Sequence, residues 1–567
     1  MIYYICKYTP IELFAGFGQE CGPLEELSEN FDLSDQIAHA NLCGFGKSVI
    51  QAVLAGKVSE LVLVNCCDSI RRVYDILEST GRCRFLYFLD LPHDDADCER
   101  QRFAYAIRGL KEAYERYSGI AFDYDRFLAA FAGRKPAQSP YIGLLGVRVS
   151  GVLEDMIREN VGMDVVNLTC TGSRDVVPDA DVLKKARSAP KEHEDELFLA
   201  YSGAILSQMP CFRMKNTSQR TSLMLDPQLK GVIYHTIKFC DFYGFEYASM
   251  KKDLNVPLLK IETDFTTQSA GQLLTRIQAF AETMTGMDGL DAGKKLDEKG
   301  IEKMKTGKYY VAGIDSGSTS TDVVILDQDG NITSQMIIPT GGGATLSAAK
   351  SLEMAREEAG IAEDDIIRIV TTGYGRAYIK GGDNSITEIT CHAKGAHHLN
   401  PDVRTVIDIG GQDIKAIHLD ENGGVKNFLM NDKCAAGTGR FLEMMARTLG
   451  LSLEEMSAAG LQWKENIVIS SMCTVFAESE VVSLVAQDKA VPDIVHGLNV
   501  SVASKVGPLV SRAGKEPQFM LTGGVARNMG VVKALEEKIE APIYICDEAQ
   551  ICGALGAALF AYEECRR

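Results

Sequence analysis

The sequence predicts an α/β protein with parallel sheets, built from two blocks that a linker joins. Apolar runs rich in β-branched residues alternate with helical patterns, and this alternation occurs both before and after residues 285–308. That segment is rich in glycine and lysine and contains no aromatic residue, which is typical of a solvated linker. The length of 567 residues is too great for one hydrophobic core and predicts between three and four units of roughly 150 residues.

Composition and charge narrow the class of protein. Hydrophobic residues make up 46% of the chain and charged residues 24%, as in folded globular proteins. The net charge of −18 argues against nucleic acid or an anionic membrane surface as a partner. The chain begins without a signal-peptide pattern and has no run of about 20 apolar residues, so we expect a cytoplasmic protein with no membrane partner.

The 16 cysteines are many for such a protein. A reducing compartment argues against structural disulfides, so most of these thiols are expected to be small buried side chains. The sequence contains no C-x-x-C pair. A metal or iron–sulfur site would therefore be assembled from distant segments of the chain.

The first block, residues 1–284, consists of two similar halves at about 1–138 and 139–284. Apolar, β-branched patterns predict strands at 59–67, 84–92, 141–149, 163–170, 230–240 and 256–265. Cys67, Cys170 and Cys240 stand at or just beyond the carboxyl ends of predicted strands, which is where open parallel sheets bind ligands. We expect two open, Rossmann-like parallel-sheet subdomains.

The second block, residues 309–567, contains an internal repeat. Residues 311–331 and 405–424 share a strand ending in Ile-Asp, a glycine-rich turn, a second aspartate and a second strand ending in Leu-Asp. The repeat aligns Asp315 with Asp408 and Asp322 with Asp413. Two such hairpins, about 93 residues apart, predict a duplicated domain with lobes of about 309–400 and 401–567.

The turns of this repeat predict a nucleotide site. Glycine-rich turns bring backbone N–H groups close to phosphate oxygens, and the two facing aspartates would hold Mg²⁺ and orient a hydrolytic water. A third turn at 520–530 follows a strand and opens a helix, which suits an adenosine or phosphate contact. The chain has no P-loop motif. The expected nucleotide contacts are Asp315, Ser316, Gly317, Ser318, Thr319, Thr321, Asp408, Gly410, Gly411, Gln412, Gly523, Gly524 and Val525.

These motifs resemble a known superfamily. DSGSTST at 315–321, DIGGQD at 408–413 and TGGVA at 522–526 look like the phosphate and adenosine motifs of the actin–hexokinase–acetate kinase superfamily. More narrowly, a further set of segments resembles the ATP-dependent activators of 2-hydroxyacyl-CoA dehydratases, a group that includes benzoyl-CoA reductase ATPase subunits. Those segments are 370–379, 386–396, 431–446, 470–484 and 547–559. The resemblance covers 309–567 and implies an actin-like ATPase with a duplicated ribonuclease H-like fold that uses ATP and Mg²⁺.

Cys434 and Cys473 each stand directly before a helical pattern. A helix N-terminus carries partial positive charge and free N–H groups, which suit an anionic thiolate-ligated cluster. In the activators that this sequence resembles, such a cysteine pair from each of two subunits holds one [4Fe–4S] cluster on the twofold axis. The resemblance implies a homodimer through the C-terminal domain and an electron donor such as ferredoxin or flavodoxin. It also implies that ATP binding or hydrolysis moves the lobes and lowers the reduction potential at which the bridging cluster passes on an electron.

The first block is similar to the 2-hydroxyacyl-CoA dehydratase subunit family over most of 8–284. The segments that carry this similarity include ELFAGFG, ANLCGFGK, NCCDSIRRVYDIL and GVIYHTIKFCDFY. In that family three cysteines bind a [4Fe–4S] cluster, and the matching positions are Cys43, Cys67 and Cys240. Cys66 is expected to point to the other side of an extended strand and to be structural.

Additional cysteines depart from the family pattern. Cys170 and Cys211 in the second half and Cys21 in the first would give each half three candidate ligands, whereas Cys6 is a weaker candidate. Homodimeric relatives with a double-cubane [8Fe–9S] cluster use two such sets and reduce small molecules. For this block a double cubane, a single cluster and no cluster all remain open.

Three functions compete. The chain could be an ATP-driven iron–sulfur enzyme whose first block accepts electrons from its own activator part. Alternatively, the first block could only dock a separate 2-hydroxyacyl-CoA dehydratase. A sugar or acyl kinase of the same superfamily is the third hypothesis, but it gives no reason for Cys434 and Cys473. No catalytic acid or base is assigned.

Overall fold

A computed structural model describes residues 1–25, 27–131, 139–172, 174–215, 220, 224–266, 270–285, 298–431, 435–469 and 474–566. The chain folds into two units, Met1–Phe280 and Ala281–Arg567, and each is described by itself. None of the helices in these ranges is long and apolar enough to cross a membrane.

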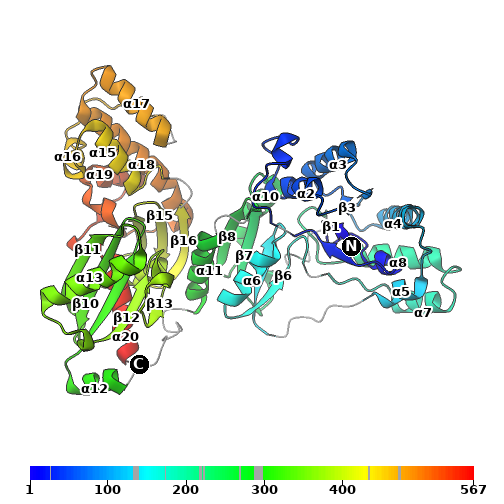
Figure 1. Ribbon diagram of the computed structural model, residues 1–567, viewed down its shortest axis with the longest axis horizontal. Helices are drawn as coiled ribbons and strands as arrows, with labels where there is room; N and C mark the ends of the chain where they lie inside the picture. Colours follow the sequence, from blue (N-terminus) through cyan, green and yellow to red (C-terminus); the bar gives the residue numbers. More distant parts are fainter. Residues whose placement is uncertain are drawn as a thin grey trace. The chain divides into compact units, whose positions relative to one another are not determined.

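Two four-stranded parallel sheets form the first unit (Figure 1). The first has the order β2-β1-β3-β4, with β1 Ile2–Tyr4, β2 Cys21–Pro23, β3 Glu60–Val64 and β4 Phe85–Leu89. The second has the order β6-β5-β7-β8, with β5 Tyr141–Gly146, β6 Asp164–Asn167, β7 Leu229–Ile237 and β8 Leu258–Thr263. The two orders correspond strand for strand, so the predicted pair of open parallel sheets is confirmed.

Helices that begin just beyond the strands cover these sheets. On α3, for example, Ile70, Val73 and Leu77 recur every three or four residues and form the buried face. Each buried aliphatic side chain of this kind stabilises the fold by about 1.5–3 kcal/mol. The helices are α1 Glu12–Ala15, α2 Gly44–Leu54, α3 Asp68–Thr80, α4 Asp97–Ser118, α5 Tyr124–Ala129, α6 Gly151–Asn160, α7 Ala180–Ser188, α8 Glu194–Leu206, α10 Asp241–Asp253 and α11 Ala270–Thr285.

The second unit contains two sheets with the same topology, which confirms the duplicated fold. One has the order β11-β10-β9-β12-β13 and the other β16-β15-β14-β17-β18, and in each an antiparallel hairpin is followed by parallel pairs. The strands are β9 Tyr310–Ser316, β10 Ser320–Asp327, β11 Ile332–Pro339, β12 Ile366–Thr372, β13 Asn384–Ser385, β14 Thr405–Ile409, β15 Ile414–Leu419, β16 Val425–Asn431, β17 Phe519–Thr522 and β18 Ile543–Tyr544.

The last helix, α20 Cys552–Arg566, packs on the first lobe, so the expected lobe boundary of 401–567 is wrong at its end. Its apolar residues share a core with β9, β10 and β12, beside which Figure 1 shows it in red. Glycines allow this helix to touch α14 Glu388–Leu399, because a Cβ on Gly556 would lie 1.8 Å from the carbonyl oxygen of Cys391. The remaining helices are α13 Ala344–Ala359, α15 Gly439–Leu449, α16 Leu453–Ala459, α17 Thr474–Ala486, α18 Val491–Gly514 and α19 Met529–Ile539.

Part of the expected linker 285–308 is helical. Residues Glu298–Thr306 form α12, from which Met304 packs against the core of the first lobe and Lys303 forms an ion pair with Asp365. Met304 and Lys303 therefore both attach this segment to the first lobe.

Candidate functional site

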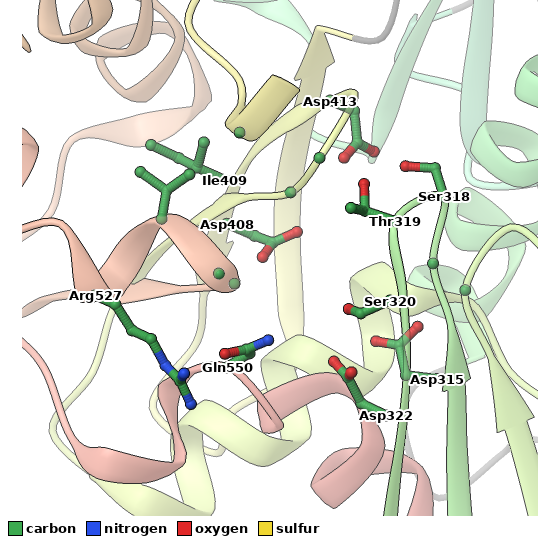
Figure 2. A pocket seen from close by; sticks show the side chains of 18 of the residues that line it. Asp315, Ser318, Thr319, Ser320, Asp322, Asp408, Ile409, Asp413, Arg527 and Gln550 are labelled. Carbon is green, nitrogen blue, oxygen red and sulfur yellow. The ribbon is translucent and has the colours of Figure 1, made fainter. Parts of the chain in front are cut away.

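A cavity of about 360 Å³ lies in the second unit between the two hairpins (Figure 2). The turn after β9 and the turn after β14 touch, because a Cβ on Gly411 would lie 1.7 Å from Thr319 Oγ1. Ten of the thirteen expected nucleotide contacts line the cavity: Asp315, Gly317, Ser318, Thr319, Asp408, Gly410, Gly411, Gly523, Gly524 and Val525. The structure therefore brings all three predicted turns to one place.

The other three expected contacts lie elsewhere. Ser316 and Thr321 are paired across β9 and β10, and both are fully buried. Side chains alternate along a strand, so these two point away from the side that Asp315 occupies. Thr321 Oγ1 lies 2.9 Å from Ser347 Oγ, inside the first lobe. Gln412 is exposed on its turn.

His392 lies between the two aspartates that we expect to hold Mg²⁺. Its Nε2 atom is 3.8 Å from Asp315 Oδ2 and 3.8 Å from Asp408 Oδ1. On the other side of the ring, Nδ1 lies 3.1 Å from Thr522 Oγ1 at the end of β17. No sequence motif predicts a role for this histidine, although it lies in the segment 386–396 that resembles the activators.

The strand register corrects the alignment of the repeat. Asp322 lies opposite Asp315 on the first hairpin, and Lys415 occupies the corresponding position opposite Asp408 on the second. The structural counterpart of Asp322 is therefore Lys415 and not Asp413. Lys415 Nζ lies 3.2 Å from Asp408 Oδ2 and 2.6 Å from Asp413 Oδ2.

The two hairpins thus differ in charge, and the pKa values of their carboxyl groups differ accordingly. Burial raises the pKa of Asp315 to about 7, and the negative charges of Asp322, Glu388 and Asp408 add to this effect, although His392 opposes it. Burial likewise raises the pKa of Asp322 to about 7. Burial would also raise the pKa of Asp408, but His392 and Lys415 outweigh it and hold that pKa below its usual value.

Several oxygen atoms at this cavity fit a magnesium ion. Asp322 Oδ1, Glu388 Oε1 and Thr319 Oγ1 are buried and have no hydrogen-bond partner among the described residues. Figure 2 shows the side chains of Asp315, Asp322 and Asp408 directed into the cavity. Carboxylate and hydroxyl oxygens are hard ligands of the kind that Mg²⁺ takes together with nucleotide phosphates.

The third turn requires glycine. Gly523 has a φ of +82°, and a Cβ there would lie 2.7 Å from Asp408 Oδ1 and 2.6 Å from the carbonyl oxygen of Ile409. Positive φ and close backbone approach are the two conditions that glycine alone meets without strain. Arg527, which follows this turn and also lines the cavity, is a cation that the sequence analysis did not identify.

Cys434 and Cys473 lie outside the described residues. The helix α17 begins at Thr474, directly after Cys473. The helix α15 begins only at Gly439, several residues later than the pattern after Cys434 predicts. Gly437 has a φ of +91°, which excludes it from a right-handed helix, and Thr438 is the N-cap.

Seven thiols gather in the first unit, and we call them the cysteine centre: Cys6, Cys43, Cys66, Cys67, Cys170, Cys211 and Cys240. Each of these cysteines lies close enough to another that a charge on one thiol shifts the pKa of its neighbour. The chain brings them together from both halves. Five of them follow the carboxyl ends of strands, namely Cys6 after β1, Cys66 and Cys67 after β3, Cys170 after β6 and Cys240 after β7, whereas Cys43 precedes α2 and Cys211 follows α8. The five lie at the sheet edge at which the sequence predicts ligand binding.

The three cysteines that match the dehydratase family each cap a helix. Cys43, Cys67 and Cys240 are the N-cap residues of α2, α3 and α10. The backbone N–H groups of Gly46 and Ile70 donate to the sulfurs of Cys43 and Cys67, each at 3.4 Å. Helix N-termini and N–H···S bonds both stabilise a thiolate.

The thiol of Cys66 does not point away from its neighbour, contrary to expectation. It forms a hydrogen bond with the thiol of Cys67, because the extended strand β3 has already ended at Val64. This hydrogen bond, together with the N–H of Ile70 and the charge of Arg213, outweighs burial and lowers the pKa of Cys67 to about 7. Cys67 is thus readily converted to the thiolate, which is the form in which a cysteine binds a metal.

Cys21 is not part of the cysteine centre, whereas Cys6 is. Cys21 lies in the edge strand β2, and the charged groups that act on it are Arg174, Glu12 and the N-terminal amino group. Cys6 lies just beyond β1, where charges on Cys211 and Cys170 add to the effect of burial and raise its pKa to about 12. The structure therefore places Cys6, and not Cys21, beside other candidate ligands.

The donors of the cysteine centre are chemically suited to an iron–sulfur cluster. In such a cube each thiolate binds a different iron atom, so the sulfurs need not converge on one point. Sulfur donors from helix N-termini with N–H···S bonds are the chemistry that such a cube requires.

Comparisons with known proteins match the two parts of the chain to two different families. Residues 312–561 match the BadF/BadG/BcrA/BcrD ATPase family, and residues 6–141 and 132–284 match the 2-hydroxyglutaryl-CoA dehydratase D-component. The 2-hydroxyisocaproyl-CoA dehydratase activator of Clostridioides difficile is 44% identical over 45% of this chain and 96% of its own length. The activator of lactoyl-CoA dehydratase from Anaerotignum propionicum is 46% identical over 46% of this chain and 99% of its own length.

A solved structure covers the same part of the chain. Component A of the (R)-2-hydroxyglutaryl-CoA dehydratase of Acidaminococcus fermentans is 44% identical over 46% of this chain and 100% of its own, with a TM-score of 0.44. Both activator sequences match this chain over nearly their whole length. The chain is therefore a member of the BadF/BadG/BcrA/BcrD ATPase family that carries a 2-hydroxyglutaryl-CoA dehydratase D-component region in the same polypeptide.

Proposed function

We propose that this chain is an ATP-driven iron–sulfur electron-transfer enzyme that contains both an activating ATPase and the acceptor of its electrons. The observation that carries this proposal is the cysteine centre. Its seven thiols gather in the same polypeptide as the activator-type nucleotide cavity. A first unit that only docked another protein would not need them.

In the second unit, the cavity residues bind and orient the nucleotide. Asp315 and Asp408 hold Mg²⁺ on the phosphates, while the turns at Gly317–Thr319 and Gly410–Gly411 supply N–H groups. Lys415 neutralises Asp408 and Asp413, so the ion is held mainly by the first hairpin. ATP binding then draws the two lobes together at these turns.

Cys434 and Cys473 are proposed to hold a [4Fe–4S] cluster together with the same pair of a second copy. A cluster of this kind supplies one-electron transfer at low potential. The face of α17 next to Cys473 supports a homodimer, because Val475 and Phe476 are 64% and 67% exposed there and Val482 and Val485 are also exposed. An apolar face of this kind on a soluble helix is typical of an interface. A ferredoxin or flavodoxin would reduce the bridging cluster.

In the first unit, the cysteine centre is proposed to accept the electrons. Cys43, Cys67 and Cys240 would hold one cube, and Cys6, Cys170 and Cys211 would hold a second. The two sets are neighbours, because charges on Cys43, Cys67 and Cys170 all add to burial in raising the pKa of Cys240 to about 12. This proximity supports a double-cubane arrangement.

The test follows electrons from one unit to the other in the full chain. Anaerobically purified protein is reduced by ferredoxin and examined by electron paramagnetic resonance (EPR) before and after addition of MgATP. We expect MgATP to produce a reduced signal that a non-hydrolysable ATP analogue does not produce, and that is lost in Cys67→Ala but retained in Cys98→Ala. Cys98 is the matched control because it is exposed and outside the cysteine centre. An identical signal in all three proteins would show that the first unit accepts no electrons.

A further inference from the structure

Arg148 is the largest completely buried side chain among the residues that the structure describes, with 1% of its surface exposed. It follows the end of β5 by two residues, as Cys6 follows the end of β1. Because β1 and β5 hold the same place in the two sheets, Arg148 occupies in the second half the position that a thiol occupies in the first. A guanidinium thus stands among the side chains of the cysteine centre.

The contacts of Arg148 leave part of its guanidinium without a partner. Its backbone N–H donates to Cys170 Sγ at 3.2 Å, and Nη1 donates to the carbonyl oxygen of Ile5 at 3.2 Å. Its Cζ atom lies 3.8 Å from the centre of the Phe45 ring. Within the described part of the chain, Nε and Nη2 are buried and find no acceptor. A buried charged donor without an acceptor is costly, so a folded protein that keeps one has an acceptor for it.

The groups around Arg148 indicate what this acceptor is. The ionisable groups that face it are the thiols of Cys170, Cys6 and Cys66 and the half-buried carboxyl group of Glu25. Lys7 is equally buried on the same side and donates to the carbonyl oxygen of Met209 at 2.6 Å. While the thiols are protonated, this region has an excess of positive charge. The missing group is therefore anionic and accepts hydrogen bonds.

We propose that Arg148 donates its free N–H groups to sulfur atoms of an anionic iron–sulfur cluster on the cysteine centre and stabilises the reduced state of that cluster. This inference rests on the proposed function, because it requires a cluster in the first unit. Each added electron makes the cluster more negative, and a nearby fixed positive charge favours that form. Arg148 would then set the potential at which the first unit accepts an electron.

The test measures the reduction potential in variants of the full chain. All variants carry Cys434→Ala, which removes the bridging cluster, so the EPR signal comes from the first unit. We expect Arg148→Gln to keep its iron and to lower the ratio of reduced to oxidised cluster about tenfold at a fixed potential, which equals about 59 mV for a one-electron couple. Arg148→Lys keeps the charge but loses the planar fork, so it should show a smaller shift in the same direction.

Arg174→Gln is the matched control. Arg174 is also buried, but its guanidinium is paired with both carboxylate oxygens of Glu12. We expect this variant to lose stability without a change in potential. If Arg148→Gln does not fold, the reduction potential of Arg148→Lys alone tests the role of Arg148. An unchanged potential in an Arg148 variant with full iron content would overturn the role of Arg148 only. Absence of iron from the first unit of the parent protein would instead overturn the proposed function.

Discussion

Replacement of Lys415 by methionine is expected to destabilise the second lobe by about 3–5 kcal/mol near neutral pH. Lys415 is buried between Asp408 and Asp413, which are themselves 3% and 4% exposed. Methionine fills a similar volume, so the packing changes little and the effect is electrostatic. Removal of the ammonium group leaves two buried carboxylates without their countercharge, which is the costly way to break a buried ion pair.

A surface ion pair provides the scale for this effect. Lys394 pairs with Glu563 in the same unit, but the Lys394 side chain is 20% exposed and that of Glu563 is 40% exposed. Lys394→Met should therefore cost about 1 kcal/mol or less. MgADP should restore part of the stability of Lys415→Met, because Mg²⁺ brings positive charge back to the cavity. It should stabilise Lys394→Met no more than it stabilises the unchanged protein.

The assay uses the single tryptophan of the chain. Trp463 stacks on His496 of α18, with ring centres 3.9 Å apart, and α18 packs on β15, which carries Lys415. Its fluorescence during urea denaturation therefore reports on the lobe that contains Lys415. Equal midpoints for Lys415→Met and Lys394→Met would refute the assignment of Lys415 as the countercharge of the nucleotide cavity.

Three further predictions concern the two sites. The pKa of Asp315 is about 7 in the folded protein, against an ordinary value of 3.8, so the folded state binds more protons than the unfolded state between these pH values. Without nucleotide, the free energy of unfolding should therefore fall as the pH rises through this window. Thermal unfolding at several pH values checks this, and Asp315→Asn should flatten the pH dependence. Gly523→Ala should weaken MgADP binding about tenfold in calorimetry, because it adds strain of about 1–2 kcal/mol, whereas Gly381→Ala, also at positive φ but with open space around it, should not. Gly44→Ala would place a Cβ 1.9 Å from a backbone carbonyl oxygen beside the cysteine centre and should lower the iron content of the first unit. Gly151 is likewise the first residue of its helix but has open space around it, so Gly151→Ala should leave the iron content unchanged.

The nucleotide turns could be predicted because their chemistry is local. A strand that ends in Asp, followed by a glycine-rich turn and a second strand, specifies both the hairpin and the carboxylate within a few residues. His392 could not be found in this way, because it reaches the cavity from a helix that begins well after the first hairpin. The error with Asp322 had a different cause. Alignment by residue type matched two aspartates, whereas the strand register matches Asp322 with Lys415.

Strand length explains why some members of the cysteine centre were easier to predict than Cys6. Cys67, Cys170 and Cys240 follow strands that the apolar pattern reveals. Cys6 follows β1, which has only three residues, Ile2–Tyr4, and gives no pattern of its own. Cys21 would complete three candidate ligands in the first half, but it belongs to the edge strand β2, and its side chain lies beside Arg174 and Glu12.

The iron and acid-labile sulfide content of anaerobically purified protein tests most directly whether this chain both supplies and accepts electrons. One bridging cube and two cubes per chain predict about 20 iron atoms per dimer, and about 12 would mean that only one set of thiols in each chain holds a cube. A value of about 4, unchanged in Cys67→Ala, would contradict an acceptor in the first unit and leave this chain an activator for a separate protein.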